Sequence, residues 1–398
     1  MKERMSGVWN RLNTKENRKL AGDVFVILLV SRLFYIFIGC VTNSAFGNNI
    51  TFAKMFLGGD ADWYIKVAEK GYSLVSGIKA GDGQANWAFF PLFPVLIRWF
   101  KHIFFFLNYR QAGILLSSIF TYITGLYLVK TVRLYKPGRL GYIAVVLLYM
   151  GPYTFYLHCV YSETLFMMLL AIFFYYLKKE SVDGSRNYWM PVIAAMLASC
   201  TRIVGVILVF PLVVRMYRDS YSGRISVKKF GSFIKDTLCT PVRMLQIFLC
   251  PAGIFVNMVH LYWVSGDAWA FRHVQTAWRE DGAGYIGNMI WDFFNNIYAE
   301  RYWIPLVVIM AVVVYIYMLK KGYYEEVVFA MITLIIPLTG GVMSMCRFIV
   351  GSYVIFLGIY DYLADKKDIK LCATALVVVM EAFLIWLWFT AGVNAFTA

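Results

Sequence analysis

VFVILLVSRLFYIFIGCV, residues Val24–Val41, is an apolar run with Arg32 as its single charged residue. About 20 apolar residues in a helix cross the roughly 30 Å of hydrocarbon in a bilayer. Comparable runs occur at Leu245–Val264 and Leu371–Phe389. The chain has 398 residues, of which 60% are hydrophobic and 15% charged, whereas a soluble protein carries about 25% charged residues. The sequence therefore predicts an all-α polytopic membrane protein.

The formal net charge of +15 is attributed to membrane topology. Lys and Arg accumulate in cytoplasmic loops of membrane proteins, so we predict a bilayer as partner and no nucleic acid. The seven cysteines are scattered along the chain, without the spacing of a metal site. We interpret them as small buried residues.

Basic clusters predict the topology of one integral-membrane domain, residues 1–398. Residues 1–20 and 215–244 are expected in the cytoplasm, and residues 42–109 and 265–302 on the outer or lumenal side. About nine full spans connect them. Segments expected to span include 140–157, 164–177, 245–264, 327–343 and 348–363.

Two segments are expected not to cross the membrane as ordinary spans. Tyr188–Met216 adjoins cytoplasmic basic clusters at both ends, which predicts a half-helix hairpin with Arg202 near its tip. The alternative is two short spans. Ala88–Leu107 contains two prolines and several basic residues, which favours a helix lying flat on the outer surface. Five aromatic residues of this region are expected to dip into the acyl chains: Phe89, Phe90, Phe93, Trp99 and Phe100.

Ionisable groups at the edge of a bilayer are costly unless they are paired or hydrated, so each is a functional candidate. Asp60 and Asp62 follow the first span, in GGDADWYIKVAEKGY (Gly58–Tyr72). For Arg32, inside the first span, a structural role is favoured over binding of a lipid phosphate. The other candidates near outer ends of spans are His158, Glu163, Arg202, Gln275 and Arg347.

The chain resembles the PIG-V family of membrane mannosyltransferases, related to GPI mannosyltransferase II, and its prokaryotic relatives in the GT-C class. The motif around Asp60 continues with Tyr64, Ala68, Gly71 and Tyr72 at the family's spacing. The family's Trp before the Asp is Gly59 here. Further blocks follow in the family's order: FFPLFP (Phe89–Pro94), YSETLF (Tyr161–Phe166), CTRIVG (Cys200–Gly205), GDAWAFRHVQTAW (Gly266–Trp278) and CRFIVGSY (Cys346–Tyr353). Val354 follows, where the family commonly has proline.

This resemblance implies an inverting glycosyltransferase that moves a hexose, most often mannose, from a polyprenyl-phosphate carrier to an acceptor hydroxyl on the outer or lumenal face. An inverting transfer needs a base for the acceptor hydroxyl, and Asp60 is our candidate. Asp62 is expected to face another direction and to play a supporting role. Arg347 and Arg202 are candidates for holding the departing phosphate, with Arg347 placed first because no acid lies near it in its short turn.

The remaining candidates are assigned to the sugar or the acceptor. Glu163, with Tyr161 before it, either accepts hydrogen bonds from sugar hydroxyls or pairs with Arg202 as scaffold. Gln275 and Trp278 share a helical face and would form a carbohydrate platform. His158 is favoured as a structural interface residue over a proton carrier. The predicted sugar or acceptor contacts are therefore Glu163, Tyr161, His158, Gln275 and Trp278.

No cofactor is predicted to be required, because Asp60 and Asp62 are too few ligands for a convincing metal site. A single divalent cation assisted by lipid phosphate is the alternative. Expected partners are the lipid-linked donor and a glycolipid or glycan acceptor. Two rival functions stay open. A lipid-linked sugar flippase would explain the intramembrane arginines, and a non-catalytic subunit of a glycan-assembly complex would explain the departures at Gly59 and Val354.

Overall fold

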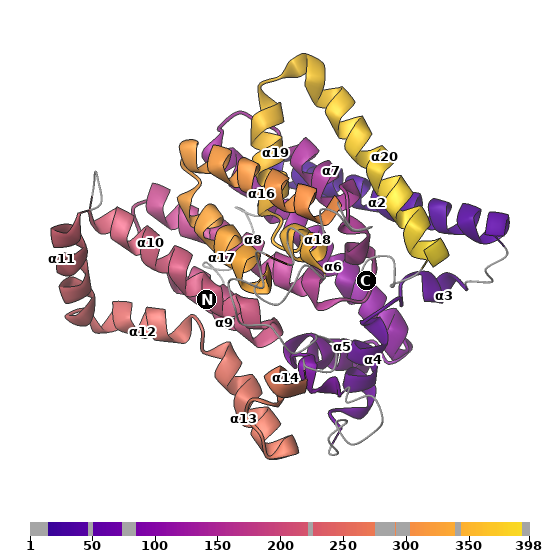
Figure 1. Ribbon diagram of the computed structural model, residues 1–398, viewed down its shortest axis with the longest axis horizontal. Helices are drawn as coiled ribbons and strands as arrows, with labels where there is room; N and C mark the ends of the chain where they lie inside the picture. Colours follow the sequence, from indigo (N-terminus) through magenta and orange to yellow (C-terminus); the bar gives the residue numbers. More distant parts are fainter. Residues whose placement is uncertain are drawn as a thin grey trace.

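The computed structural model describes residues 15–46, 51–73, 85–221, 226–274, 291, 303–338 and 344–391. Within these ranges the chain forms α-helices and short 3-10 segments, with no β-strand. The prediction of an all-α protein is confirmed. Central helix α8 (Ser162–Val182) packs between α6 (Tyr109–Tyr135) and α9 (Trp189–Thr201). Terminal helices α2 (Lys15–Phe46) and α20 (Lys367–Ala391) pack on each other at one side (Figure 1).

The other elements complete the architecture. In chain order they are α3 (Phe52–Met55), α4 (Ala61–Lys70), η2 (Asn86–Ala88), α5 (Leu92–Ile103), α7 (Tyr142–Met150), η3 (Thr154–His158), η4 (Ile203–Leu208), α10 (Val209–Ser220), α11 (Val227–Leu238), α12 (Pro241–Leu249), α13 (Gly253–Ser265), α14 (Ala270–His273), α16 (Trp303–Lys320), α17 (Tyr324–Leu338), α18 (Met345–Val350) and α19 (Val354–Ala364).

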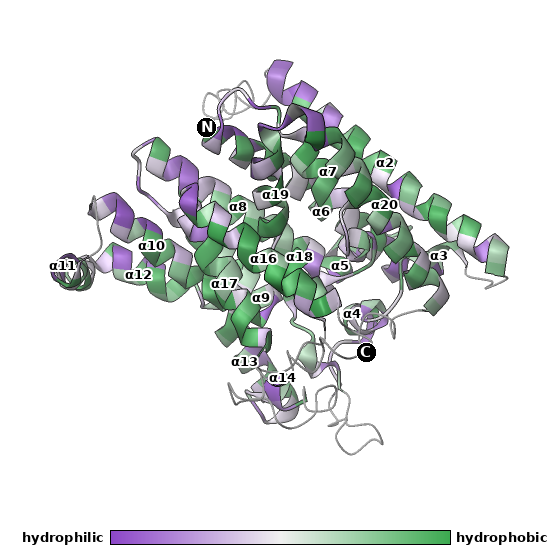
Figure 2. Ribbon diagram, turned by 45° about the horizontal axis from the view of Figure 1, so that its top comes forward, coloured by the Kyte–Doolittle hydropathy of each residue, from purple (hydrophilic) through white to green (hydrophobic). Residues whose placement is uncertain are grey.

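Among the described residues, four helices are long and apolar enough to cross a bilayer: α2, α6, α16 and α20. The apolar window of α20 is only 22% buried, and that of α2 only 28%. Both helices are largely hydrophobic along their length (Figure 2). Helices with exposed apolar faces of this extent are stable against lipid rather than water. The chain is therefore an integral, multi-pass membrane protein.

Several predicted continuous spans are broken in the structure. Leu245–Val264 is divided at Pro251 into α12 and α13, which are bent by 51° and count as a fifth span if taken together. The segment predicted at 140–157 ends its helix at Met150, before Gly151 and Pro152. Proline lacks an amide hydrogen and disfavours helical backbone at the residue before it. The segment 348–363 is divided between α18 and α19. Of the other predicted spans, 164–177 lies within the continuous helix α8, and the rest are represented in the described residues by shorter or interrupted helices.

Tyr188–Met216 has the hairpin shape that was predicted, and its placement as half-helices rather than two short spans stays a prediction. Helix α9 ends at Arg202, whose backbone is extended (φ −151°, ψ 145°), and the chain then returns through η4 and α10. The Tyr188 hydroxyl donates to the Asp219 carboxylate, so the start of α9 and the end of α10 lie together. A Cβ atom at Gly205 would lie 2.4 Å from the carbonyl carbon of Ala198. Only glycine permits so close a return of the chain.

Helix α5 has 12 residues, a length of about 18 Å, which is too short to span the hydrocarbon. The prediction that this region does not cross the membrane agrees with this length. The aromatic residues of this region were predicted to dip into the acyl chains, and this prediction was partly wrong. Phe89, Phe90 and Phe93 are buried within the protein, and Phe93 packs against the ring of Tyr64. Trp99, by contrast, is 66% exposed.

The basic segment predicted as a cytoplasmic loop, residues 215–244, is largely helical. It contains the end of α10, the whole of α11 and the start of α12. Arg215 is buried and forms ion pairs with Asp219 (2.9 Å) and with Glu325 (3.4 Å). Part of the positive charge therefore holds helices together rather than facing water.

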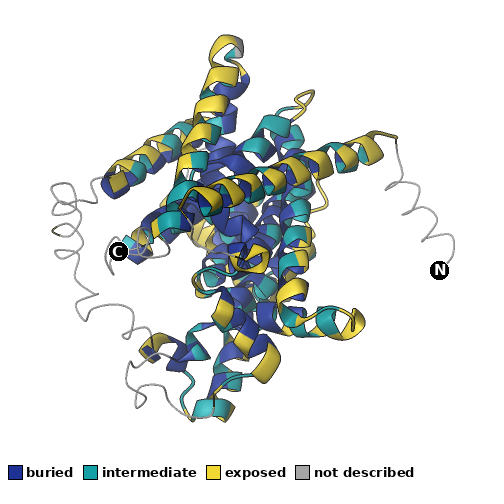
Figure 3. Ribbon diagram, turned by 90° about the vertical axis from the view of Figure 1, so that its right-hand side faces the viewer, coloured by how far each residue is buried: buried dark blue, intermediate teal, exposed yellow. Residues whose placement is uncertain are grey.

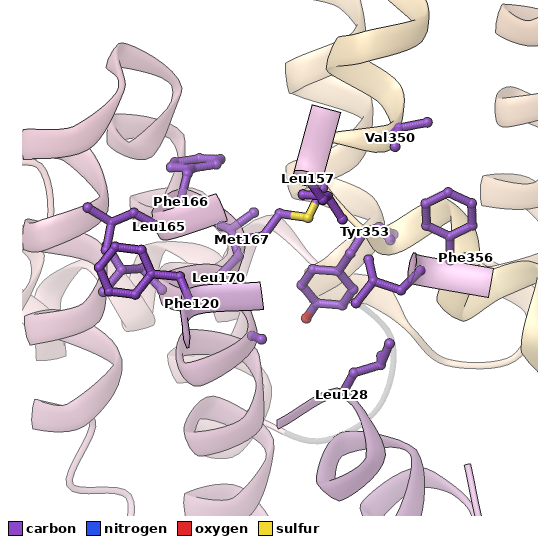
Figure 4. Packing of buried hydrophobic residues seen from close by; sticks show 14 of the residues in the cluster. Phe120, Leu128, Leu157, Leu165, Phe166, Met167, Leu170, Val350, Tyr353 and Phe356 are labelled. Atoms are coloured by element: carbon purple, nitrogen blue, oxygen red, sulfur yellow. The ribbon is translucent and has the colours of Figure 1, made fainter. Parts of the chain in front are cut away.

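Buried hydrophobic residues concentrate in the centre of the molecule, and exposed ones on the outer helices (Figure 3). A close view shows side chains of α8, including Leu165 and Phe166, in the same core as Val350 and Tyr353, which lie at and just beyond the end of α18 (Figure 4). This packing fixes the ends of two helices that carry charged candidates.

Gly253→Ala is expected to destabilise the protein by about 1–3 kcal/mol, the usual cost of overpacking. A Cβ atom at Gly253 would lie 2.1 Å from the Met196 carbonyl oxygen, so α13 could not approach α9 as closely. The midpoint of thermal unfolding in detergent measures the effect. Gly231→Ala is the control, since a Cβ atom there has nothing within 4 Å. Equal midpoints for the two variants would contradict the close packing.

Candidate functional site

Four charged side chains that are distant in sequence meet at one place. Arg347 Nη1 lies 2.8 Å from Asp60 Oδ2, and Arg347 Nε lies 2.5 Å from Glu163 Oε1. Arg202 Nη1 lies 2.7 Å from the same oxygen of Glu163. Asp60 immediately precedes α4, Glu163 begins α8, Arg202 forms the tip of the hairpin, and Arg347 lies in α18. The four residues are called the charged cluster below.

The charged cluster is neutral overall and graded in exposure. Its two carboxylates balance its two guanidinium groups. The side chain of Glu163 is 5% exposed, that of Arg347 14%, that of Arg202 19% and that of Asp60 38%. Glu163 is therefore the buried centre of the cluster. Its ion pairs are strengthened because water is largely excluded around it. Asp60 is the member most accessible to an incoming molecule.

Local sequence explains how each carboxylate is placed. Glu163 lies in the first turn of α8, where the helix dipole favours negative charge. Gly59 has a positive φ of 58°, a conformation that costs other residues energy. A Cβ atom at Gly58 would lie 2.4 Å from the ring of Trp388. The glycine pair thus turns the chain tightly beneath Trp388 and delivers Asp60 to the cluster.

Aromatic and hydroxyl groups hold the cluster in position. The Arg347 guanidinium lies 4.5 Å from the ring centroid of Tyr161 and 5.2 Å from that of Tyr156. The Asp60 amide donates to the Tyr161 hydroxyl at 3.0 Å. Arg202 donates to the Ser162 hydroxyl at 3.3 Å. The Tyr161 hydroxyl therefore supports the backbone of Asp60, and Arg347 binds its carboxylate.

The structure corrects the premise on which Arg347 was ranked first. Arg347 was expected to have no acidic neighbour, but it pairs with both Asp60 and Glu163. Sequence distance concealed these partners, since Arg347 is separated by 287 positions from Asp60 and by 184 from Glu163. Of the two alternatives for Glu163, the ion pair with Arg202 is present.

Other predicted site residues lie apart from the cluster or outside the described residues. Asp62 is exposed on α4, and no ion pair joins it to another described residue. His158 is buried and stacks on Tyr35, with ring centroids 4.5 Å apart, so it does not join the charged cluster. Arg32 donates to the Leu157 carbonyl oxygen. Gln275 and Trp278 lie outside the described residues.

Three residues of the site were not singled out from the sequence as contributors: Tyr64, Tyr156 and Ser162. The Tyr64 and Ser162 hydroxyls lie 2.6 Å apart, and Ser162 also contacts Arg202. Both belong to motifs that were quoted, in GGDADWYIKVAEKGY and YSETLF. A signal was therefore present for these two. Nothing in the sequence distinguished Tyr156 among the 28 tyrosines.

A small, partly open pocket of about 30 Å³ lies against the charged cluster. Glu163, Arg202 and Arg347 form its polar side. Its apolar side is formed by Phe166, Val204, Phe329, Pro337 and Phe348. The pocket thus combines two guanidinium groups, which are paired with carboxylates, with a hydrocarbon-like wall. That combination suits a molecule with an anionic head and an apolar tail.

The block GDAWAFRHVQTAW (Gly266–Trp278) is described as far as Val274. Asp267 Oδ2 lies 2.6 Å from His273 Nδ1, and Asp267 Oδ1 accepts the Trp269 amide at 2.8 Å. Slight burial raises the pKa of Asp267, but the hydrogen bonds from His273 and from the Trp269 amide outweigh it and lower the pKa. Within the described part of the chain, no three His, Cys, Asp or Glu side chains are grouped so that they could hold a metal ion.

No protein-family model and no curated protein matches this chain. Among solved structures, the apo form of an oligosaccharyltransferase from Archaeoglobus fulgidus matches with a TM-score of 0.45 and 13% sequence identity. The match covers 94% of this chain and 55% of that chain, so this chain spans about half the length of that protein. A similarity at this level assigns no function to the chain.

Proposed function

We propose that the chain is a GT-C-class inverting glycosyltransferase that transfers a hexose, with mannose favoured over other hexoses, from a polyprenyl-phosphate carrier to an acceptor hydroxyl. The observation that carries the proposal is the meeting of a partly exposed carboxylate, Asp60, with two guanidinium groups beside an apolar pocket. The carboxylate supplies a base, the guanidinium groups bind the phosphate, and the apolar side chains beside them contact the first part of the prenyl chain.

Binding of the donor must rearrange the ion pairs. Arg347 uses Nη1 for Asp60 and Nε for Glu163. A phosphate oxygen of the donor would compete with Asp60 for the Arg347 guanidinium. Asp60 is displaced before Glu163 because it is the more exposed of the two carboxylates. Glu163 keeps its bonds to both arginines and holds them side by side. Donor binding therefore releases the Asp60 carboxylate for its role as base.

The transfer is then a single displacement at C1 of the sugar. The acceptor hydroxyl oxygen attacks C1 of the sugar, and its proton passes to Asp60. The bond between C1 and the phosphate oxygen breaks, and the oxygen keeps the electron pair. Arg347 and Arg202 stabilise the negative charge that develops on this oxygen. Attack and departure on opposite faces of C1 invert its configuration.

Purified protein in nanodiscs tests the proposal when it is given polyprenyl-phosphate-linked hexoses and a set of glycolipid acceptors. Mass spectrometry detects a product one hexose larger, and NMR determines its anomeric configuration. Retained configuration would contradict the mechanism. Movement of labelled carrier across the bilayer without product would favour the flippase. Donor binding without either event would favour a non-catalytic subunit.

Tyr161→Phe is expected to lower the transfer rate by up to about tenfold, because the Asp60 amide loses a hydrogen bond worth roughly 0.5–1.5 kcal/mol. Tyr156→Phe is the matched control. Both rings face the Arg347 guanidinium, but only the Tyr161 hydroxyl accepts from Asp60. Initial rates of both variants at saturating donor measure the effect. Equal losses would show that the hydroxyl of Tyr161 does not position the base.

A further inference from the structure

Helix α11 presents an apolar stripe that the rest of the described chain leaves largely uncovered; only Phe230, at the edge of the stripe, has a ring contact with Tyr217, with centroids 6.3 Å apart. Val227, Phe230, Ile234 and Leu238 are 91%, 49%, 45% and 62% exposed. Their spacing of three and four residues places them along one side of the helix. The helix is capped by the Ser226 hydroxyl, which accepts the Lys229 amide. The stripe therefore belongs to a well-formed amphipathic helix.

The side of α11 that adjoins Phe230 attaches the helix to the protein. Phe233 is 3% exposed, and its ring lies 5.5 Å from that of Tyr217 on α10. The Tyr221 hydroxyl donates to the Asp236 carboxylate. The Arg243 guanidinium lies 5.7 Å from the Phe233 ring centroid. These contacts fix the orientation of α11 and leave the apolar stripe facing outward.

Exposed lysines adjoin the stripe. Lys228 and Lys235 are separated by two helical turns and so lie on one side of α11, next to the apolar residues. Both are exposed, and neither forms an ion pair with a described residue. The acidic residue of the helix, Asp236, is already bonded to Tyr221. The free face of α11 is therefore apolar with a basic border.

The position of α11 determines what covers this face. Only Cys239 and Thr240 separate it from Pro241, the start of the bent α12–α13 pair that is apolar enough to span a membrane. Figure 1 shows α11 at the margin of the molecule, between α10 and α12. Phe248 on α12 is 68% exposed. Helix α11 therefore lies directly before a segment that is apolar enough to be embedded in the membrane.

We infer that α11 lies in the surface of the bilayer, with its apolar stripe among the acyl chains and Lys228 and Lys235 on the headgroups of anionic lipids. A basic amphipathic helix binds such a surface through apolar burial together with attraction to negative lipid. The inference is independent of the proposed enzymatic function. It assigns the protein a lipid-composition-sensitive contact on the side where residues 215–244 lie.

Hydrogen–deuterium exchange of residues 226–240 in the full chain tests this inference. The protein is placed in nanodiscs of phosphatidylcholine, in nanodiscs that also contain phosphatidylglycerol, and in detergent. We expect exchange several-fold slower in the anionic nanodiscs than in the neutral ones. Lys228→Gln/Lys235→Gln should abolish the difference between the two lipids. Phe230→Ser/Ile234→Ser should speed exchange in both.

Lys54→Gln/Lys70→Gln is the control, since it removes the same charge from exposed positions on α3 and α4. This variant should keep the slower exchange in anionic lipid. Equal exchange in both lipids, or a difference that survives Lys228→Gln/Lys235→Gln, would overturn the inference. Protection that depends on the number of protein copies per nanodisc would also overturn it, and would assign the stripe to a second copy of the chain.

Discussion

Asp60→Asn is expected to lower hexose transfer by about 100-fold to 10,000-fold, the usual contribution of a general base. An amide has nearly the same shape as the carboxylate but does not accept the hydroxyl proton. Donor binding should be kept or strengthened, because Arg347 loses one of its two competing carboxylates. The rate of product formation and the affinity for the lipid-linked donor are measured separately.

Asp62→Asn is the matched control for this variant. Asp62 is two residues away and exposed, and no ion pair joins it to another described residue. The Asp62→Asn variant should keep a transfer rate within a few-fold of that of the unmodified protein. The stability of Asp60→Asn should change by about 1 kcal/mol or less, since Asp60 is 38% exposed and exposed pairs contribute little. Undiminished transfer by Asp60→Asn would remove Asp60 as the base.

Glu163→Gln is expected to destabilise the fold by about 3–5 kcal/mol, the cost of removing one partner from a buried ion pair. The Arg202 and Arg347 guanidinium groups share one oxygen of Glu163, whose side chain is only 5% exposed. Without this negative charge, two partly buried positive charges face each other with Asp60 alone to balance them. The midpoint of thermal unfolding in detergent should fall accordingly.

A double-mutant cycle separates charge balance from shape. Glu163→Gln/Arg202→Gln restores neutrality, so its stability loss should be smaller than the sum of the two single losses. Glu69→Gln, at an exposed position on α4, serves as the control and should change stability little. Additive losses in the cycle would show that Glu163 and Arg202 are not coupled, contrary to their 2.7 Å contact.

These two experiments distinguish catalysis from structure within one cluster. Substitution of Asp60 should lower the transfer rate with little change in stability, whereas substitution of Glu163 should mainly lower stability. A single mutation at Arg347 would change both, because this guanidinium contacts both acids. The graded burial of the cluster is the physical reason for the difference. Its accessible end reacts, and its buried end holds the arginines in place.

The hydropathy and charge of the sequence determined the class of the protein. Long runs such as Val24–Val41 predict lipid-embedded helices from local composition alone, and α2 contains that run. The two prolines and the basic residues of Ala88–Leu107 predict a segment that does not cross the membrane. Basic residues at both ends of Tyr188–Met216 predict its hairpin. Each of these is a property of one segment and its immediate neighbours.

The tertiary structure alone decided which charges meet. Sequence analysis selected Asp60, Glu163, Arg202 and Arg347 as separate candidates, but it left Arg347 without an acidic partner and Glu163 with two alternatives. Their contacts depend on how α4, α8, α9 and α18 pack, and thus on interactions between segments hundreds of residues apart. Local pattern predicts the conformation of a segment and its preference for lipid or water. The distance between two side chains on different helices follows only once those helices are packed together.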